Sequence, residues 1–197
     1  MRLWPALEAM PGPAAVLAEW RRLAGAELDF LTPYLQPRQR LAASYPHVVG
    51  GEPTYPYEVV EHGPDDFVGI CPETEDRIVL TRKDLIVYEL DWPLFLGDIA
   101  AALGFERRAA DPDELPPLTR LVGDYRPTAG YSFPAYLTVP LESRTLTSAV
   151  CMLVSTSDDA LILLTPTRRR LRPDAQQILE RKRCCFLPLQ EALAATG

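Results

Sequence analysis

Three short apolar runs alternate with two segments of helical periodicity in the last third of the chain. The runs are Tyr136–Val139, Leu161–Leu164 and Cys184–Leu187. Runs that are apolar at nearly every position suit strands buried on both faces, and the intervening segments are long enough for the crossovers that parallel strands require. The pattern therefore predicts a small parallel sheet with right-handed connections, arranged as a β-α-β-α-β-α unit.

The segments between these runs carry helix signals. Apolar residues recur at helical intervals over residues 146–154, which favours a helix despite the β-branched content, and Ser143 or Thr145 could cap it. The segment Pro173–Lys182 has proline at its first position and basic residues in its last turn. A short helix over Gln190–Ala195 is expected to close the chain.

The middle of the chain changes to a period of two. Gly63-Pro64-Asp65-Asp66 is a hairpin turn in which proline presets φ and the aspartates bind backbone donors. Asp91 is a suitable N-cap for an amphipathic helix that ends at Leu103, with Gly104 at the C′ position. Four runs predict strands of a mostly antiparallel sheet: Tyr57–His62, Phe67–Cys71, Arg77–Leu80 and Leu85–Leu90.

These elements predict an α/β protein, mixed α+β overall, in which a β-rich module with an amphipathic helix precedes the parallel-sheet unit. Helical spacing and flanking prolines and glycines predict N-terminal helices over Pro13–Ala24 and Glu27–Tyr34. An alternative is a single mixed domain in which both sheets merge. The expected divisions are residues 1–36 for N-terminal helices, 37–104 for the β-rich module, 105–132 for a proline-rich connection and 133–197 for the α/β unit.

Composition indicates a folded, soluble protein. Of 197 residues 47% are apolar, but no apolar run approaches the ~20 residues that span a bilayer, and the first ten residues lack the layout of a signal peptide. The four cysteines lie in or beside apolar runs, which favours free thiols in a reducing cytoplasm over disulfides. The basic residues are 18 Arg and 2 Lys, typical of a GC-rich bacterial genome. We therefore expect a bacterial, cytoplasmic protein with no membrane contact.

The charge distribution is uneven. The net charge of -7 should repel nucleic acid at long range. Residues 168–183, however, hold seven basic and two acidic side chains, a local +5, so the rest of the chain carries -12. Such an asymmetry indicates either a polyanion site or a solvated basic helix face.

The run Leu161–Leu164 is followed by Thr165-Pro166-Thr167-Arg168. These eight residues resemble the strand and Pro-Thr-Arg element with which DEAD-box helicases touch a nucleic-acid backbone. The chain has no glycine-rich phosphate loop ending in Lys-Ser/Thr, which argues against ATPase activity. Arginines pointing into water are the simpler alternative to a phosphate site. The residues that could hold a phosphate at this edge of the sheet are Thr165, Thr167, Arg168, Arg169 and Arg170.

Three catalytic or metal motifs are incomplete. Pro173-Asp174 with Glu180-Arg181-Lys182 matches the letters of a PD-(D/E)xK nuclease, but both carboxylates fall on one predicted helix, some 120° apart. The hairpin region resembles a zinc ribbon, yet a structural zinc needs four ligands and only His47, His62 and Cys71 are nearby. No serine lies in a nucleophile elbow. The sequence therefore predicts no catalytic residue, no metal and no cofactor.

Two function classes remain. The first is a non-enzymatic regulatory or interaction module that contacts nucleic acid, another polyanion or a protein partner. The second is a nucleotide or small-molecule enzyme or sensor whose ligand lies near Ser143, Thr165, Thr167 and Glu191. A third possibility is that the acidic remainder docks a protein. Besides the phosphate-site arginines, the expected contact surface has four basic residues: Arg172, Arg181, Lys182 and Arg183.

Overall fold

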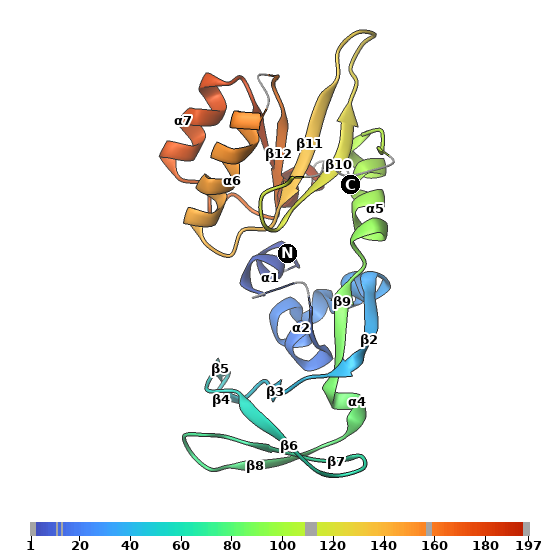
Figure 1. Ribbon diagram of the computed structural model, residues 1–197, viewed down its shortest axis with the longest axis vertical. Coiled ribbons are helices and arrows are strands. Elements are labelled where there is room, and N and C mark those ends of the chain that lie inside the picture. Colours follow the sequence, from blue (N-terminus) through green and yellow to red (C-terminus); the bar gives the residue numbers. More distant parts are fainter. Residues whose placement is uncertain (1–2, 11, 13, 109–113, 157–158, 195–197) are drawn as a thin grey trace. The chain divides into compact units, whose positions relative to one another are not determined.

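The computed structural model describes residues 3–10, 12, 14–108, 114–156 and 159–194 and contains two compact units (Figure 1). The first combines Leu3–Pro11 with Trp92–Gly197, and the second is Gly12–Asp91. The second unit is therefore inserted in the sequence of the first. The divisions expected at residues 36, 104 and 132 stay predictions. In the two compact units, the helix after Asp91 belongs with the C-terminal α/β elements, whereas the expected division placed it with the β-rich module.

A four-stranded mixed sheet forms the centre of the first unit. The prediction of parallel strands after residue 133 is confirmed, because β12 (Ile162–Thr165) pairs in parallel with both β11 (Phe133–Thr138) and β13 (Cys185–Pro188). The sheet also contains β10 (Thr119–Tyr125), a strand that the sequence did not predict and that pairs antiparallel to β11. In spatial order the strands are β10, β11, β12 and β13.

Two helices pack together beside β12, α6 (Ser143–Thr156) and α7 (Pro173–Arg181) (Figure 1). Both follow the predicted periodicity, and Pro173 occupies the first turn of α7 as expected. Because one stripe of each helix is apolar, the two stripes and the sheet exclude water from a shared core. The core residues are Leu146, Val150, Leu153, Leu161, Leu163, Ala175 and Leu179.

Three further helices complete the first unit: α1 (Leu3–Ala9), α5 (Trp92–Leu103) and α8 (Leu189–Ala192). The rings of Trp4 and Phe95 lie 6.3 Å apart between α1 and α5. Gly104 has a φ of 69°, which confirms the predicted C′ position of α5, because glycine adopts this left-handed backbone without a steric cost.

The second unit contains three small sheets. The first has the order β1 (Ala14–Val16), β9 (Ile86–Leu90) and β2 (Leu35–Leu41), and the second the order β3 (Ser44–Tyr45), β6 (Tyr57–Gly63), β7 (Asp66–Ile70) and β8 (Arg77–Leu80). The third pairs β4 (Val48–Val49) with β5 (Glu52–Pro53). The predicted hairpin is confirmed as β6 and β7. The remaining elements are α2 (Leu17–Ala24), η1 (Gly25–Glu27), α3 (Leu28–Leu31), η2 (Thr32–Tyr34) and α4 (Arg82–Leu85).

Several predicted elements were wrong or missed. The helix expected over Pro13–Ala24 begins at Leu17, because the residues before it pair with β9 as a strand; Pro13 itself lies outside the described residues. The polar connection before β9 is the helix α4, closed by a capping box between Thr81 and Asp84. Leu85 is therefore helical and not the start of a strand. In the expected connection 105–132, β10 is regular structure.

The fold class is confirmed as mixed α/β, with 37% of residues helical and 32% in strands. In the part of the chain that the structure describes, no helix has both the length and the apolar content needed to cross a lipid bilayer.

Candidate functional site

The carboxyl ends of β11, β12 and β13 share one edge of the mixed sheet, which we call the carboxyl edge. Because β10 runs the other way, its first residue lies at this edge too. The hydroxyl oxygens of Thr119 and Thr138 lie 2.9 Å apart there, both on fully buried residues. Thr165, at the end of β12, is also fully buried. The edge is thus lined by hydroxyl groups beneath the surface.

A carboxylate from α1 binds the predicted phosphate ligands. Glu8 is only 3% exposed and accepts two hydrogen bonds from Thr167, at 3.0 Å from the backbone N–H to Oε1 and at 2.7 Å from the hydroxyl to Oε2. Thr165 donates its hydroxyl to the carbonyl of Thr167 at 2.8 Å. The donors that the sequence predicted for a phosphate are therefore brought together, but they are bound within the protein.

The environment of Glu8 contains opposing effects. Burial raises the pKa of its carboxyl above the ordinary 4.5, while the two hydrogen bonds from Thr167 lower it. The charges of Arg170 and Arg169 also lower it. Burial is the largest of these effects, so the net direction of the pKa shift is upward.

Arg168 is fixed by an ion pair and an aromatic ring. Its Nε and Nη2 each donate to the carboxylate of Glu191 at 3.1 Å, and its guanidinium lies 5.6 Å from the ring centroid of Phe186. The hydrogen bond from Arg168 lowers the pKa of Glu191, and the same bond raises the pKa of Arg168. Two residues predicted at one site are thus paired with each other.

The next arginines lie in the connection between β12 and α7. The backbone N–H of Arg169 donates to the hydroxyl oxygen of Thr167 at 3.1 Å, and its side chain is exposed. Arg170 is half-buried, and its Nε has no hydrogen-bond partner among the described residues. Arg172 is exposed immediately before α7. We call Arg168, Arg169, Arg170 and Arg172 the arginine loop.

The other predicted basic residues lie elsewhere. Arg181 is the last residue of α7, roughly 13 Å along the helix axis from Arg172, and Lys182 and Arg183 follow it. They precede β13, whereas the arginine loop follows the parallel strand β12. The two basic groups therefore lie at opposite edges of the sheet. The local charge of +5 is divided between two places.

Ser143, expected near the ligand of the alternative function, begins α6 after β11. Its carbonyl accepts the hydroxyl of Thr147 at 3.2 Å.

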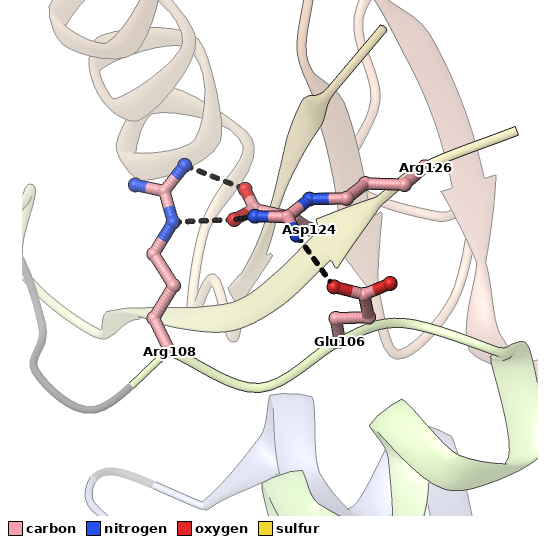
Figure 2. Close-up of polar contacts among 4 residues, drawn as sticks. All are labelled: Glu106, Arg108, Asp124 and Arg126. Carbon is pink, nitrogen blue, oxygen red and sulfur yellow. Dashed lines mark hydrogen bonds and ion pairs between the residues drawn. The ribbon is translucent and has the colours of Figure 1, made fainter. Parts of the chain in front are cut away.

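An ion-pair network that the sequence analysis missed lies where β10 ends. Asp124 is 2% exposed, and both of its carboxylate oxygens accept hydrogen bonds from Arg108, at 2.5 Å from Nε and 2.6 Å from Nη2 (Figure 2). Arg126 donates to Glu106 at 2.7 Å and approaches Asp124 at 3.8 Å. The sequence did carry a signal for this network. Glu106 and Arg108 are two residues apart, as are Asp124 and Arg126, and side chains at this spacing lie on the same face of a strand, where they can pair with those of an antiparallel neighbour.

The same four residues fasten the segment after α5 to the edge of the sheet. The backbones of Glu106 and Asp124 exchange two N–H···O bonds of 2.8 Å each. A Cβ at Gly123 would lie 2.5 Å from the carbonyl oxygen of Glu106, so only glycine permits this approach. We assign the network to structure, since each of its four side chains is paired with another member of the network.

The histidines and Cys71 do not form a zinc site. Within the described ranges, no three His, Cys, Asp or Glu side chains are grouped to hold a metal ion. His47 and Cys71 do come together, and His62 is exposed on β6. All four cysteines are free.

The chain matches no known protein-family model, and no curated protein or solved structure is significantly similar to it.

Proposed function

We propose that this protein is a non-enzymatic interaction module that contacts a polyanion, with nucleic acid as the favoured class, through the arginine loop. The observation that carries the proposal is the concentration of four arginines in five residues after β12, at the carboxyl edge of the mixed sheet's parallel strands. Open α/β sheets commonly bind their ligands at this edge.

The electrostatics of the loop support this proposal. Two described carboxylates interact with the loop, Glu8 with Arg169 and Arg170 and Glu191 with Arg168, against four positive charges. Arg169 and Arg172 have exposed side chains. Because a guanidinium presents a planar fork of donors, exposed arginines are suited to bidentate contacts with phosphate oxygens.

The experiment measures oligonucleotide binding by fluorescence anisotropy over a series of salt concentrations. If Arg169 and Arg172 contact phosphates, the variant Arg169→Ala/Arg172→Ala should bind roughly tenfold more weakly and show a salt slope smaller by about 2, because two fewer counterions are released.

The matched control is Arg181→Ala/Arg183→Ala, which changes the net charge equally at the other edge of the sheet. This control should keep most of the affinity and of the salt slope. Equal losses in both double variants would indicate general attraction without a site. No binding of wild-type protein at low salt would refute the proposal.

A phosphorylated small molecule is the second candidate. The observation that favours it is the arrangement of the Thr167 N–H and hydroxyl around a carboxylate, since an oxyanion presents similar acceptors. Such a ligand must displace Glu8. A thermal-shift screen of nucleotides and phosphorylated metabolites should then raise the melting temperature, more strongly in Glu8→Gln than in wild type. No shift across the panel in either protein would reject this candidate.

A further inference from the structure

The strand β8 forms an open edge of the four-stranded sheet in the second unit. The order of this sheet is β3, β6, β7 and β8, so among the described residues β8 has a neighbouring strand on one side only (Figure 1). The strand at the opposite edge, β3, contains only Ser44 and Tyr45. An open edge presents backbone N–H and C=O groups that can pair with another strand. β8 is therefore the longer of the two places at which this sheet can be extended.

The hydrogen-bond pattern shows which backbone groups of β8 point outward. The N–H of Cys71 donates to the carbonyl of Asp76 at 2.9 Å, so these two residues form a hydrogen-bonded pair where the β7–β8 hairpin closes. The register continues from this pair along β8 without a shift, and bonded and non-bonded pairs alternate in an antiparallel ladder. The N–H and C=O of Ile78 therefore face β7, whereas those of Arg77 and Val79 point away from it.

The residue after β8 agrees with this alternation. The N–H of Thr81 is expected to point away from β7 as well, and it donates to Oδ2 of Asp84 at 2.9 Å within the capping box of α4. The outward N–H of Thr81 is thus already used by the protein. The outward groups of Arg77 and Val79 face no strand of the described chain.

An exposed row of valines leads to this edge. Val60, Val68 and Val79 lie directly opposite one another on β6, β7 and β8. Val68 is half-buried, Val60 is 39% exposed and Val79 is 81% exposed, the highest value among the described large apolar side chains. The other face of the sheet contributes to a buried apolar cluster, so the valines lie on its solvent face. An apolar side chain placed beside Val79 would extend the row and remove it from water.

The charge around the edge selects the partner. Residues 52–84 contain nine acidic and three basic side chains, a net charge of -6, and all nine acidic side chains are exposed. Glu75 and Asp76 directly precede β8, and Asp65 and Asp66 lie in the β6–β7 turn next to its other end. Two copies of the protein joined at this edge would bring equal negative charges together, whereas a basic segment is attracted to it.

We propose that the β8 edge binds an extended, basic segment of a partner protein by strand addition. The N–H and C=O groups of Arg77 and Val79 form main-chain hydrogen bonds with the added strand. An apolar side chain of the segment covers Val79, and its basic side chains approach the acidic turns at both ends of β8. In this mode of recognition the main chain supplies affinity and the alternate side chains supply specificity. The site is separate from the arginine loop, which belongs to the first unit.

The experiment measures the binding of a fluorescein-labelled peptide to the whole protein by fluorescence anisotropy. The probe has about eight residues in which lysine and valine alternate, and the matched peptide has glutamate in place of lysine. At low salt the lysine peptide should bind at least about tenfold more tightly, and the difference should shrink at high salt because exposed charges are screened. Equal binding of the two peptides, or no binding of the lysine peptide, would overturn the proposed partner.

Two variants of Val79 test the strand addition itself. Val79→Pro removes the outward N–H but no hydrogen bond to β7, and an edge strand tolerates proline where its N–H faces solvent, so this variant should fold and bind the lysine peptide at least roughly tenfold more weakly. Val79→Thr is the matched control. It keeps the N–H and the β-branched shape, so its affinity should stay within about threefold of wild type. Equal affinities of wild type and Val79→Pro, or equal losses in the two variants, would refute strand addition.

If Val79→Pro proves unfolded by circular dichroism, amide hydrogen exchange in wild type decides. The amides of Arg77 and Val79 should exchange rapidly in the free protein and become protected when the lysine peptide is bound. The amide of Ile78, which faces β7, should exchange slowly in both states. Unchanged exchange at Arg77 and Val79 would overturn the proposal. Protection of these two amides without peptide, together with the mass of a dimer in sedimentation, would assign the edge to a second copy of the chain and would overturn it as well.

Discussion

Replacement of Glu8 by alanine is expected to lower the free energy of unfolding of the first unit by about 2–4 kcal/mol. The N–H and hydroxyl of Thr167 would both lose their acceptor at a site where neither is exposed to water. Urea denaturation followed by circular dichroism measures the change. The loss is larger than that of an ordinary surface substitution because the donors remain buried after the acceptor is removed.

The control for this experiment is Glu8→Gln, which retains the size of the side chain and one carbonyl acceptor. It should cost much less than Glu8→Ala. Equal losses in the two variants would mean that charge, and not the hydrogen bonds to Thr167, is what the site requires.

The pH dependence of Glu8 has a definite sign. Because its folded-state pKa is raised, the folded protein holds this proton at pH values where the unfolded chain, with a pKa near 4.5, has released it. The stabilising contribution is therefore present below about pH 4.5 and is lost as the pH rises through the folded-state pKa. The unfolding free energy of wild type, relative to Glu8→Gln, should fall with increasing pH in this range. A rise would contradict the assigned direction.

Replacement of Arg108 by alanine is the second change with a large expected effect, about 2–4 kcal/mol. It removes both hydrogen bonds to Asp124 and leaves a carboxylate that is 2% exposed. Arg126, 3.8 Å from the same carboxylate, compensates for part of the loss. Chemical denaturation of the variant and of wild type under identical conditions gives the difference.

Arg126→Ala is the matched control, since it removes the same charge from the same network (Figure 2). Its ion pair with Glu106 is solvent-exposed, at 53% and 61% for the two side chains, so the expected cost is below about 1 kcal/mol. Adding Asp124→Asn to Arg108→Ala should recover stability, because the buried charge is then absent. Equal effects of the two arginine variants would refute the importance of burial at Asp124.

Local pattern was sufficient to predict much of the α/β unit. α6 and α7 follow from apolar residues at helical spacing, and β12 follows from a short run that is apolar at every position. β10 was missed because its apolar centre is only Leu121-Val122, and because the rest of the strand is polar yet mostly buried. Its burial comes from neighbouring strands and cannot be seen in its own residues.

The candidate site could be predicted only in part. The strand end and the arginines are adjacent in sequence, so Thr165, Thr167 and the loop were found together. Glu8 lies 159 residues from Thr167, and no periodicity connects the two positions. The division of the basic residues between two edges also depends on the direction of β13, which fixes where each end of α7 lies.

The insertion of Gly12–Asp91 into the first unit has a consequence during synthesis. The chain emerges from the ribosome N-terminus first, so α1 is made long before the strand end that receives Glu8. The inserted unit can fold while α1 still lacks its binding site, and the first unit can close only after residue 167 has been translated. We therefore expect the insert to mature first and the surrounding unit to be completed last.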